Sequence, residues 1–232
     1  RAGAGSAGST LTAQQPENNI VRVALQALAG ILGGVQSFHT AAYDEALALP
    51  SEHSALLALR TQQVLAHESG AAEVIDPLGG SYYVESLTDQ IETEVNRYIA
   101  RIEAEGGMLK AIDEGRAQTE IAQSAYAYQQ QIETQERTVV GVNRFEDDDD
   151  PAIELHRPRP EVVEAQIAKL QSLRRERDNA AVRGALAALE GEARGDGNLM
   201  YPILEAVRAY ATIGEICAVL RDVFGEYRAA SF

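Results

Sequence analysis

Residues 9–70 have the pattern of a helix, a short strand, a polar loop and a second helix. Apolar residues at helical spacing predict that the first helix begins near Asn18. Gly33-Gly34 should end it, because glycine commonly follows the last residue of a helix. The residues expected on its buried face are Val21, Ala24, Leu25, Leu28 and Leu32.

The same stretch continues with an expected strand over residues 35–38, followed by a polar loop. Ser51 is placed to cap a second helix over residues 52–68. This order of elements is the repeating unit of an α/β barrel, whose chemistry lies where strands end and loops begin. The pattern therefore predicts an α/β fold, with its functional surface at residues 36–45.

The composition and charge exclude several classes of protein. The chain has 232 residues, 45% of them hydrophobic, which is enough for a sizeable core. No apolar run approaches the roughly 20 residues of a membrane helix, and the first residues do not have the pattern of a secretion signal. A net charge of −15 disfavours nucleic acid and anionic lipid as partners. We therefore expect no nucleic acid and no membrane among its partners.

The single cysteine, Cys217, forbids an intrachain disulfide and is typical of a reducing compartment. A cytoplasmic location is therefore expected. Cys217 lies in an apolar helical run, so the pattern favours a buried and unreactive thiol over a nucleophile.

The motifs of common catalytic sites are absent from the sequence. No two of the four histidines are spaced i, i+4, and with one cysteine a zinc site is not expected. There is no nucleophile elbow, phosphate-binding glycine loop or dinucleotide fingerprint. His39, just after the predicted strand, could bond a ligand or the loop backbone. Asp44 and Glu45 could position a hydroxylated ligand or cap the turn.

The remaining segments are predicted to be mostly helical. Apart from Arg1, residues 1–9 are all Ala, Gly or Ser, which is more typical of a flexible linker than of a strand. Short strands are expected at residues 71–75 and 138–143. Ser86 should cap a long helix, and its expected buried stripe consists of Leu87, Ile91, Val95, Tyr98 and Ile102.

Four parts are expected along the chain. Residues 1–80 would hold the last strands and helices of a barrel, and residues 81–145 the helices that pack on it. Residues 146–160 carry an acidic run and three prolines, which favours a linker. Residues 161–232 would form a helical tail.

Long segments of the sequence closely resemble the adenosylcobalamin-dependent acyl-CoA mutases. This family includes the methylmalonyl-CoA mutase large subunit and its isobutyryl- and 2-hydroxyisobutyryl-CoA relatives. The segments are residues 9–22, 33–40 (GGVQSFHT), 43–50 (YDEALALP), 68–70, 76–85 and 140–143. The resemblance covers nearly the whole chain in the same order. It implies the C-terminal portion of a TIM-type (β/α)8 substrate-binding barrel, from about its sixth strand, followed by a mostly helical extension.

The resemblance implies an isomerase that rearranges the carbon skeleton of a short branched acyl-CoA by radical chemistry. The cofactor would be adenosylcobalamin, with its cobalt ligated by a module outside this chain. The expected partners are the acyl-CoA substrate, a cobalamin-binding subunit or domain, and the remaining N-terminal portion of the barrel, in an oligomer. The family's catalytic histidine belongs to the earlier strands, so no catalytic residue is assigned and no activity is expected of this chain alone.

Five positions are candidate site residues. Gln36 resembles the glutamine that hydrogen-bonds the thioester region of the substrate, and His39 is a second candidate for substrate binding. Glu45 and Ala46 resemble the pair that contacts the adenosyl group, Glu45 through the ribose hydroxyls. Gly8 matches a glycine that lies against the cofactor.

The sequence departs from the family at two further positions, which precede Gly8. Gly3 and Gly5 stand where relatives usually carry a histidine and a glutamine. This departure favours a second hypothesis, in which the chain is a non-catalytic assembly module or an inactive fragment of such a mutase.

Overall fold

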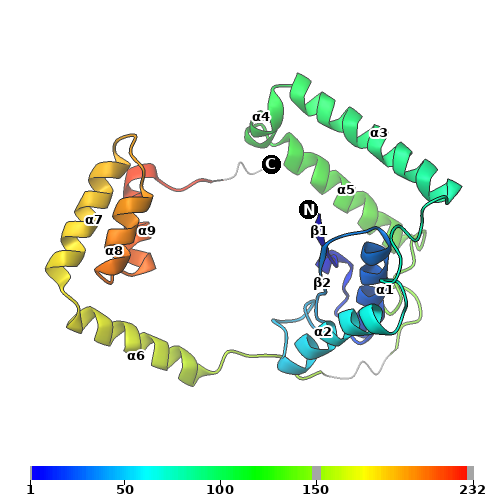
Figure 1. Cartoon of the computed structure of the whole chain (residues 1–232), viewed down its shortest axis with the longest axis horizontal. Helices are drawn as coiled ribbons and strands as arrows, with labels where there is room; N and C mark the ends of the chain where they lie inside the picture. Colours follow the sequence, from blue (N-terminus) through cyan, green and yellow to red (C-terminus); the bar gives the residue numbers. More distant parts are fainter. Residues whose placement is uncertain (1, 148–152, 229–232) are drawn as a thin grey trace. The chain divides into compact units, whose positions relative to one another are not determined.

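The computed structural model describes residues 2–147 and 153–228. The chain divides into an N-terminal unit, which ends at Arg157, and a C-terminal unit, which begins at Pro158 (Figure 1). Part of the expected acidic linker, residues 148–152, lies outside the described residues. The finer division into four parts stays a prediction.

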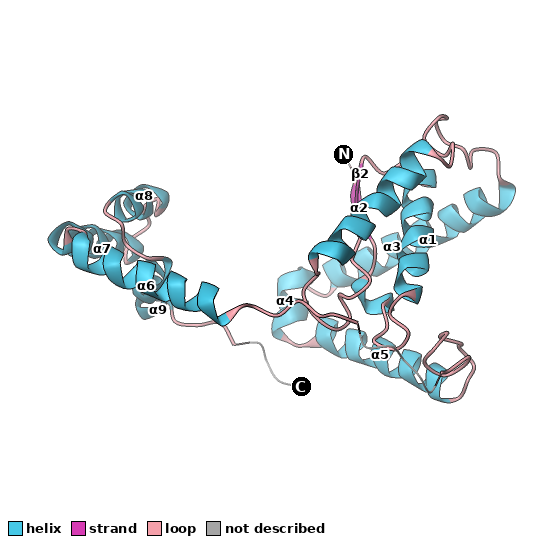
Figure 2. Cartoon of the chain, turned by 90° about the horizontal axis from the view of Figure 1, so that it is seen from below, coloured by secondary structure: helices cyan, strands magenta, loops and turns pink. Residues whose placement is uncertain are grey.

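The described residues are mostly helical, with one small parallel sheet (Figure 2). Strand β1 (Gly3–Gly5) pairs with β2 (Ser37–His39), and helices α1 (Asn18–Leu32) and α2 (Glu52–His67) accompany them. This arrangement is consistent with a fragment of an α/β barrel, but the described residues do not form a closed barrel. Among the residues that the structure describes, no helix is both long and apolar enough to cross a membrane.

The prediction of a flexible linker at residues 1–9 is wrong, because this segment contains β1. Strand pairing needs only backbone groups, and β2 supplies them. The Gln36 amide donates to the carbonyl of Ala2 (2.9 Å), and the Ser6 amide donates to the carbonyl of His39 (2.9 Å). A strand of Gly and Ala can therefore form where a neighbouring strand is already in place, although its composition does not indicate it.

The boundaries of α1 and α2 agree with the prediction within one residue. Gly33 follows α1, and the hydroxyl of Ser51 caps α2 by accepting from the Ser54 amide (3.1 Å). A cap of this kind satisfies one of the free N–H groups of the first helical turn.

The predicted buried face of α1 is wrong. Val21 and Leu25 are 60% and 63% exposed. The buried residues of the helix are Asn19, Val23 and Ala27. Apolar residues lie on more than one side of α1, and small side chains decide which side can approach the sheet.

Gly30 permits that approach. A Cβ at Gly30 would lie 2.5 Å from Cε2 and 2.7 Å from Cδ2 of Phe38 in β2. We expect Gly30→Ala to destabilise the protein by about 1–2 kcal/mol, because the overlap with a packed ring outweighs the better helix propensity of alanine. Chemical denaturation would measure this change.

Gly184 provides the matched control, because it also lies inside a helix and a Cβ there meets nothing within 4 Å. Gly184→Ala should stabilise its unit by up to about 1 kcal/mol. A Gly30→Ala variant as stable as the parent would show that Phe38 moves aside at no cost.

Three further helices belong to the N-terminal unit, and α4 joins the other two (Figure 1). They are α3 (Tyr82–Ala104), α4 (Gly107–Asp113) and α5 (Arg116–Glu133). Helix α3 begins at Tyr82 rather than after Ser86, because Ser81 is its cap. Its predicted buried stripe is wrong, since Leu87, Ile91, Val95 and Tyr98 are 40–56% exposed.

The two extra strands predicted at residues 71–75 and 138–143 are also wrong, because the first segment consists of turns and bends and the second ends in a turn without forming a strand. In the second segment, a single bridge joins Val140 to Arg144. Gly141 has a positive φ of 80°, which ends regular pairing there.

The described residues of the C-terminal unit form four helices. They are α6 (Pro160–Glu176), α7 (Asn179–Ala193), α8 (Met200–Arg208) and α9 (Ile213–Phe224). Leu189, Ala206 and Ile216 form its buried core. Cys217 follows Ile216 but is exposed, so the prediction of a buried thiol is wrong. Consecutive residues of a helix point about 100° apart, which turns Cys217 out of the core.

Candidate functional site

The candidate site lies at the carboxyl ends of β1 and β2. The strands are parallel, so the segments that follow them leave from the same edge of the sheet. Two hydrogen bonds join these segments. The Ser6 amide donates to the carbonyl of His39 (2.9 Å), and the Ala41 amide donates to Oγ of Ser6 (2.7 Å).

The loop after β2 is held against α2 by Thr40. Its buried hydroxyl donates to the carbonyl of Ala58 (2.9 Å) and accepts from Nε2 of Gln62 (2.8 Å). The start of the loop is therefore anchored to α2.

Asp44 holds the far end of this loop. Its carboxylate is fully buried, and Oδ2 accepts from the Ser51 amide (3.0 Å) at the start of α2. Its other oxygen, Oδ1, has no hydrogen-bond partner in the described residues. The turn-capping role that the sequence left open for Asp44 is therefore the one observed in the structure.

Glu45 also stabilises the turn but remains accessible. Oε1 accepts from the Ala42 amide (2.6 Å), and the Glu45 amide donates back to the carbonyl of Ala42 (3.1 Å). Both Glu45 and Ala46 are exposed. A carboxylate has several acceptor positions, so Glu45 can cap the turn with one oxygen and accept from a ligand with the other.

Gly8 begins a single turn of 3₁₀ helix, Gly8–Thr10, shortly after the end of β1 at Gly5. A Cβ placed on Gly8 meets nothing within 4 Å, so the space beside its backbone is open. His39 is exposed at the end of β2, next to Gly5, where an added Cβ would lie 3.5 Å from Cβ of His39. The segments that carry Gly8, His39, Glu45 and Ala46 thus leave the sheet at the same edge.

Gln36 lies at the other end of β2, before the strand begins. Its side chain is engaged at both atoms, because Oε1 accepts from the Ala2 amide (2.5 Å) and Nε2 donates to the carbonyl of Gly34 (3.1 Å). It also lines a pocket of about 330 Å³ between α1, β2 and α2. The structure therefore does not group Gln36 with the other candidates.

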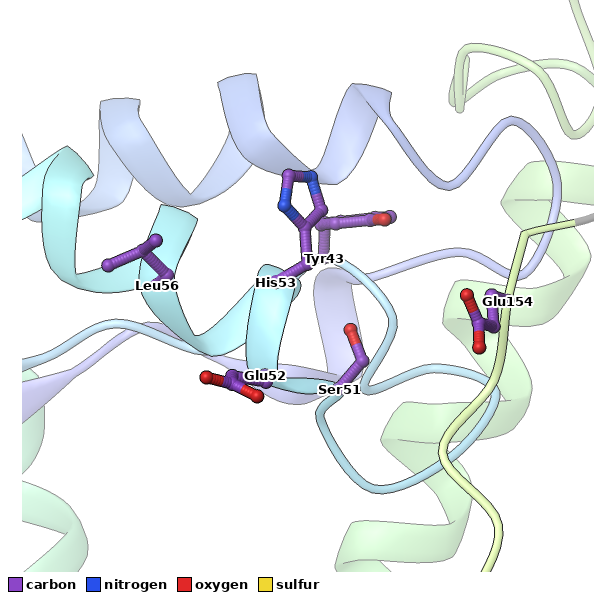
Figure 3. A pocket seen from close by; sticks show the side chains of 6 residues that line it. All are labelled: Tyr43, Ser51, Glu52, His53, Leu56 and Glu154. Atoms are coloured by element: carbon purple, nitrogen blue, oxygen red, sulfur yellow. The ribbon is translucent and has the colours of Figure 1, made fainter.

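A pocket of about 520 Å³ lies beside the loop and was not indicated by the sequence (Figure 3). Its lining residues are Tyr43, Ser51, Glu52, His53, Leu56 and Glu154. Burial raises the pKa of the Tyr43 hydroxyl, and the negative charges of Asp44 and Glu17 raise it further. Among the described residues, no group of three His, Cys, Asp or Glu side chains could hold a metal ion.

Comparison with known proteins decides the family. The sequence model of the family described as Methylmalonyl-CoA mutase matches residues 1–226. The chain belongs to the methylmalonyl-CoA mutase family. This match confirms the resemblance to acyl-CoA mutases drawn from the sequence motifs.

Members of the methylmalonyl-CoA mutase family from distant organisms are similar to this chain at comparable levels. The 2-hydroxyisobutanoyl-CoA mutase large subunit of Aquincola tertiaricarbonis is 44% identical over 225 residues, which cover 96% of this chain and 40% of that subunit. The methylmalonyl-CoA mutase of Rhizobium meliloti is 42% identical, covering 97% of this chain and 32% of the relative. The mitochondrial methylmalonyl-CoA mutase of Macaca fascicularis is 43% identical, and the match covers 99% of this chain and 31% of the relative.

The chain therefore spans between about a third and two fifths of the length of these mutases. It is homologous to acyl-CoA mutases, which are isomerases, over nearly all of its own length.

Proposed function

We propose that this chain is the C-terminal part of the substrate-binding barrel of an adenosylcobalamin-dependent acyl-CoA mutase. It would act together with the remaining N-terminal portion of the barrel and a cobalamin-binding subunit or domain. The observation that carries the proposal is the meeting of the segments of Gly8 and Glu45 at one edge of the β1–β2 pair, in a chain of this family. The reaction would be the rearrangement of a short branched acyl-CoA.

The residues at this edge fit the adenosyl group of the cofactor. Glu45 presents an exposed carboxylate whose position is fixed by the Ala42 amide. A carboxylate is a strong acceptor for the two vicinal hydroxyls of a ribose. Gly8 leaves open space beside its backbone, so a large ring system can approach it closely. Ala46, next to Glu45, adds a small apolar contact.

Bound adenosylcobalamin supplies the radical chemistry, and the protein supplies orientation and the exclusion of water. On the substrate side, the exposed imidazole of His39 can donate to a carbonyl oxygen. Gln36 can take the role of the family's thioester-binding glutamine only by giving up its bonds to Ala2 and Gly34. We therefore assign the stronger role in this chain to Glu45.

The alternative function is a non-catalytic assembly module. Gly3 and Gly5 favour it, because they lie opposite Ser37 and His39 and leave that side of β1 without polar side chains. The experiment on Glu45 also separates these two functions, since a module without cofactor chemistry has no use for that carboxylate.

In the assembled mutase that contains this chain, Glu45→Ala is expected to weaken adenosylcobalamin binding by about 10- to 100-fold, the usual cost of losing hydrogen bonds to a charged acceptor. Glu45→Gln keeps an oxygen for the Ala42 amide and removes the charge. This variant should preserve the turn and still weaken the binding of the cofactor. Equilibrium titration with adenosylcobalamin and turnover of the acyl-CoA measure both effects.

Glu68→Ala serves as the control, because Glu68 is an exposed glutamate at the far end of α2. It should leave the cofactor affinity within about twofold of the parent. If Glu45→Ala binds and uses the cofactor as well as the parent does, the cofactor role is wrong and the assembly module is the better function.

A further inference from the structure

Asn19 makes an unusually complete set of hydrogen bonds for a buried amide. The residue is fully buried in the first turn of α1. Its oxygen accepts from the Thr12 amide (3.1 Å) and from Nη1 of Arg22 (2.7 Å). Its nitrogen donates to the carbonyls of Thr12 (2.9 Å) and Tyr43 (2.8 Å). An asparagine amide has two donor and two acceptor positions, and all four are used here.

These bonds join two segments that are far apart in the sequence. Thr12 follows β1 and the Gly8–Thr10 turn, whereas Tyr43 belongs to the loop after β2, two residues before Glu45. The same region holds a small apolar cluster of Leu11, Val23 and Ala41, which packs the two segments and α1 together.

Arg22 determines which way the amide of Asn19 faces. Its guanidinium donates to Oδ1 of Asn19 and to Oγ1 of Thr12 (2.8 Å), and its Nη2 donates to the carbonyl of Val140 (2.8 Å). With a cation beside the oxygen, the NH2 group is directed toward the two carbonyls. The network therefore has a single consistent arrangement.

We propose that Asn19 is a positioning residue for cofactor binding, which fixes Glu45 relative to Gly8. Thr40 and Asp44 tie their loop to α2, but Asn19 ties the same loop to α1 and to the segment that carries Gly8. This inference rests on the proposed role of Glu45 in binding adenosylcobalamin. A shift of about 1 Å between the two segments would misplace the carboxylate, and such shifts are costly in precisely built sites.

Asn19→Asp tests the inference with almost no change in shape. The aspartate keeps both acceptor bonds, to Thr12 and Arg22, but it places an oxygen against the carbonyls of Thr12 and Tyr43. In the assembled mutase we expect adenosylcobalamin to bind about 10-fold more weakly, while the KM for the acyl-CoA changes by less than about threefold.

Two further readouts separate positioning from general damage to the fold. If Asn19 acts through Glu45, the double variant Asn19→Asp/Glu45→Ala should bind the cofactor no more weakly than Glu45→Ala alone. In the chain without cofactor, hydrogen exchange at the amides of Leu47 and Ala48, which donate to the carbonyl of Asp44, should become several-fold faster.

Asn18→Asp is the matched control, because it makes the same substitution one residue earlier, where the side chain donates to Oε1 of Gln15 (2.9 Å). It should leave cofactor affinity within about twofold of the parent. If Asn19→Asp fails to fold, Arg22→Met replaces it. Removing the guanidinium should weaken cofactor binding about threefold. In a double variant with Glu45→Ala, it should cause no further loss of cofactor affinity.

The outcomes distinguish this inference from the proposed function. Unchanged cofactor binding in Glu45→Ala refutes the role of Glu45 itself. The positioning role alone is overturned by either of two results. In the first, Glu45→Ala weakens cofactor binding but Asn19→Asp does not; in the second, the effects of the two substitutions add fully.

Discussion

Leu189→Ala is expected to destabilise the C-terminal unit by about 3 kcal/mol, within the range measured when a buried leucine is truncated. Leu189 is 0% exposed and packs in the centre of the core with Ala206 and Ile216. Neither neighbour can fill the space, because Ala206 is small and both are held on helices. Urea denaturation of the full chain would measure the change as a lower midpoint for this unit.

Leu204→Ala is the matched control. Leu204 is on α8 in the same unit but is 45% exposed, so its truncation removes fewer contacts. Its cost should stay below about 1 kcal/mol. Equal costs at Leu189 and Leu204 would contradict a core centred on Leu189.

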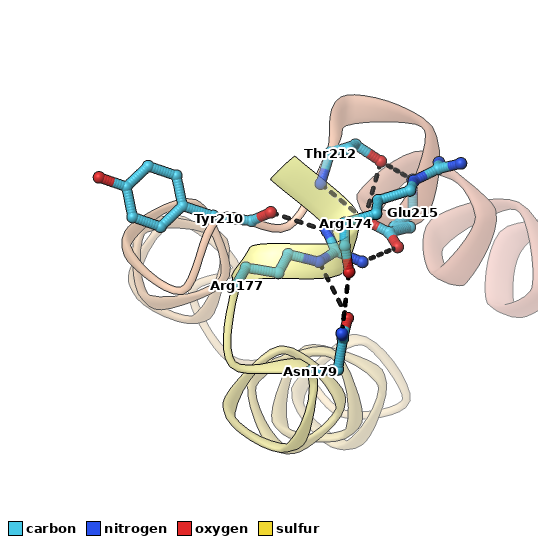
Figure 4. Close-up of polar contacts among 6 residues, drawn as sticks. All are labelled: Arg174, Arg177, Asn179, Tyr210, Thr212 and Glu215. Carbon is cyan, nitrogen blue, oxygen red and sulfur yellow. Dashed lines mark hydrogen bonds and ion pairs between the residues drawn. The ribbon is translucent and has the colours of Figure 1, made fainter. Parts of the chain in front are cut away.

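The second large effect concerns the ion pair between Arg177 and Glu215 (Figure 4). The Arg177 side chain is 5% exposed and donates to both carboxylate oxygens of Glu215, and also to the carbonyl of Tyr210 (2.8 Å). Glu215 in turn accepts from the amide and the hydroxyl of Thr212, both at 2.8 Å. The Glu215 amide donates back to Oγ1 of Thr212 (3.3 Å), which completes the capping box of α9. One carboxylate therefore joins the end of α6 to the start of α9.

These bonds lower the pKa of Glu215 from 4.5 to about 2, the hydrogen bond from Arg177 contributing most and burial opposing it. A carboxyl whose pKa is lower in the folded state stabilises the fold above its unfolded pKa. The stabilisation is therefore present above pH 4.5 and is lost as the pH falls from 4.5 toward 2. We expect the C-terminal unit to lose stability over this range, and Glu215→Gln to remove much of that dependence.

Denaturation of the parent and of Glu215→Gln at several pH values measures the effect. Glu190→Gln is the control, because Glu190 pairs with Arg194 on the exposed surface of α7. Exposed pairs contribute little, so this variant should keep the parent's pH dependence. Parallel pH profiles for the parent and Glu215→Gln would show that another group dominates acid unfolding.

The boundaries of α1 and α2 were predictable because their signals are local, whereas the predicted start of α3 after Ser86 was wrong. Ser51 lies directly before α2 and bonds its first turn, and Gly33-Gly34 follows α1 directly. Each signal acts within one helical turn, so no knowledge of the rest of the fold is needed.

Buried faces were less predictable, because they depend on what covers them. The stripe of Leu87, Ile91 and Val95 has clear helical spacing, yet it is exposed on α3. On α1, the close contact at Gly30 favours the face of Val23 over that of Leu25. Spacing identifies an apolar face but not the element that packs against it.

The candidate site was predictable only in part. The sequence placed Glu45 in the loop that follows a strand. It left open whether Glu45 caps the turn or positions a ligand, and the bond to the Ala42 amide is the capping alternative. Asn19 was missed, because an asparagine at the start of a helix is usually interpreted as a cap. Its partner Tyr43 is 24 residues away, and no local signal points to such a contact.

The double contact between Gln36 and Ala2 has a consequence for how β1 is aligned. A strand of Gly-Ala-Gly has almost no side chains to specify its register, and glycine-rich strands are prone to slip along their neighbours. Gln36 bonds both the amide and the carbonyl of Ala2, through its side chain and its backbone respectively. A slip in either direction would break both bonds at once. Gln36 thus fixes the register of β1, and with it the position of the segment that carries Gly8 at the carboxyl end of the sheet.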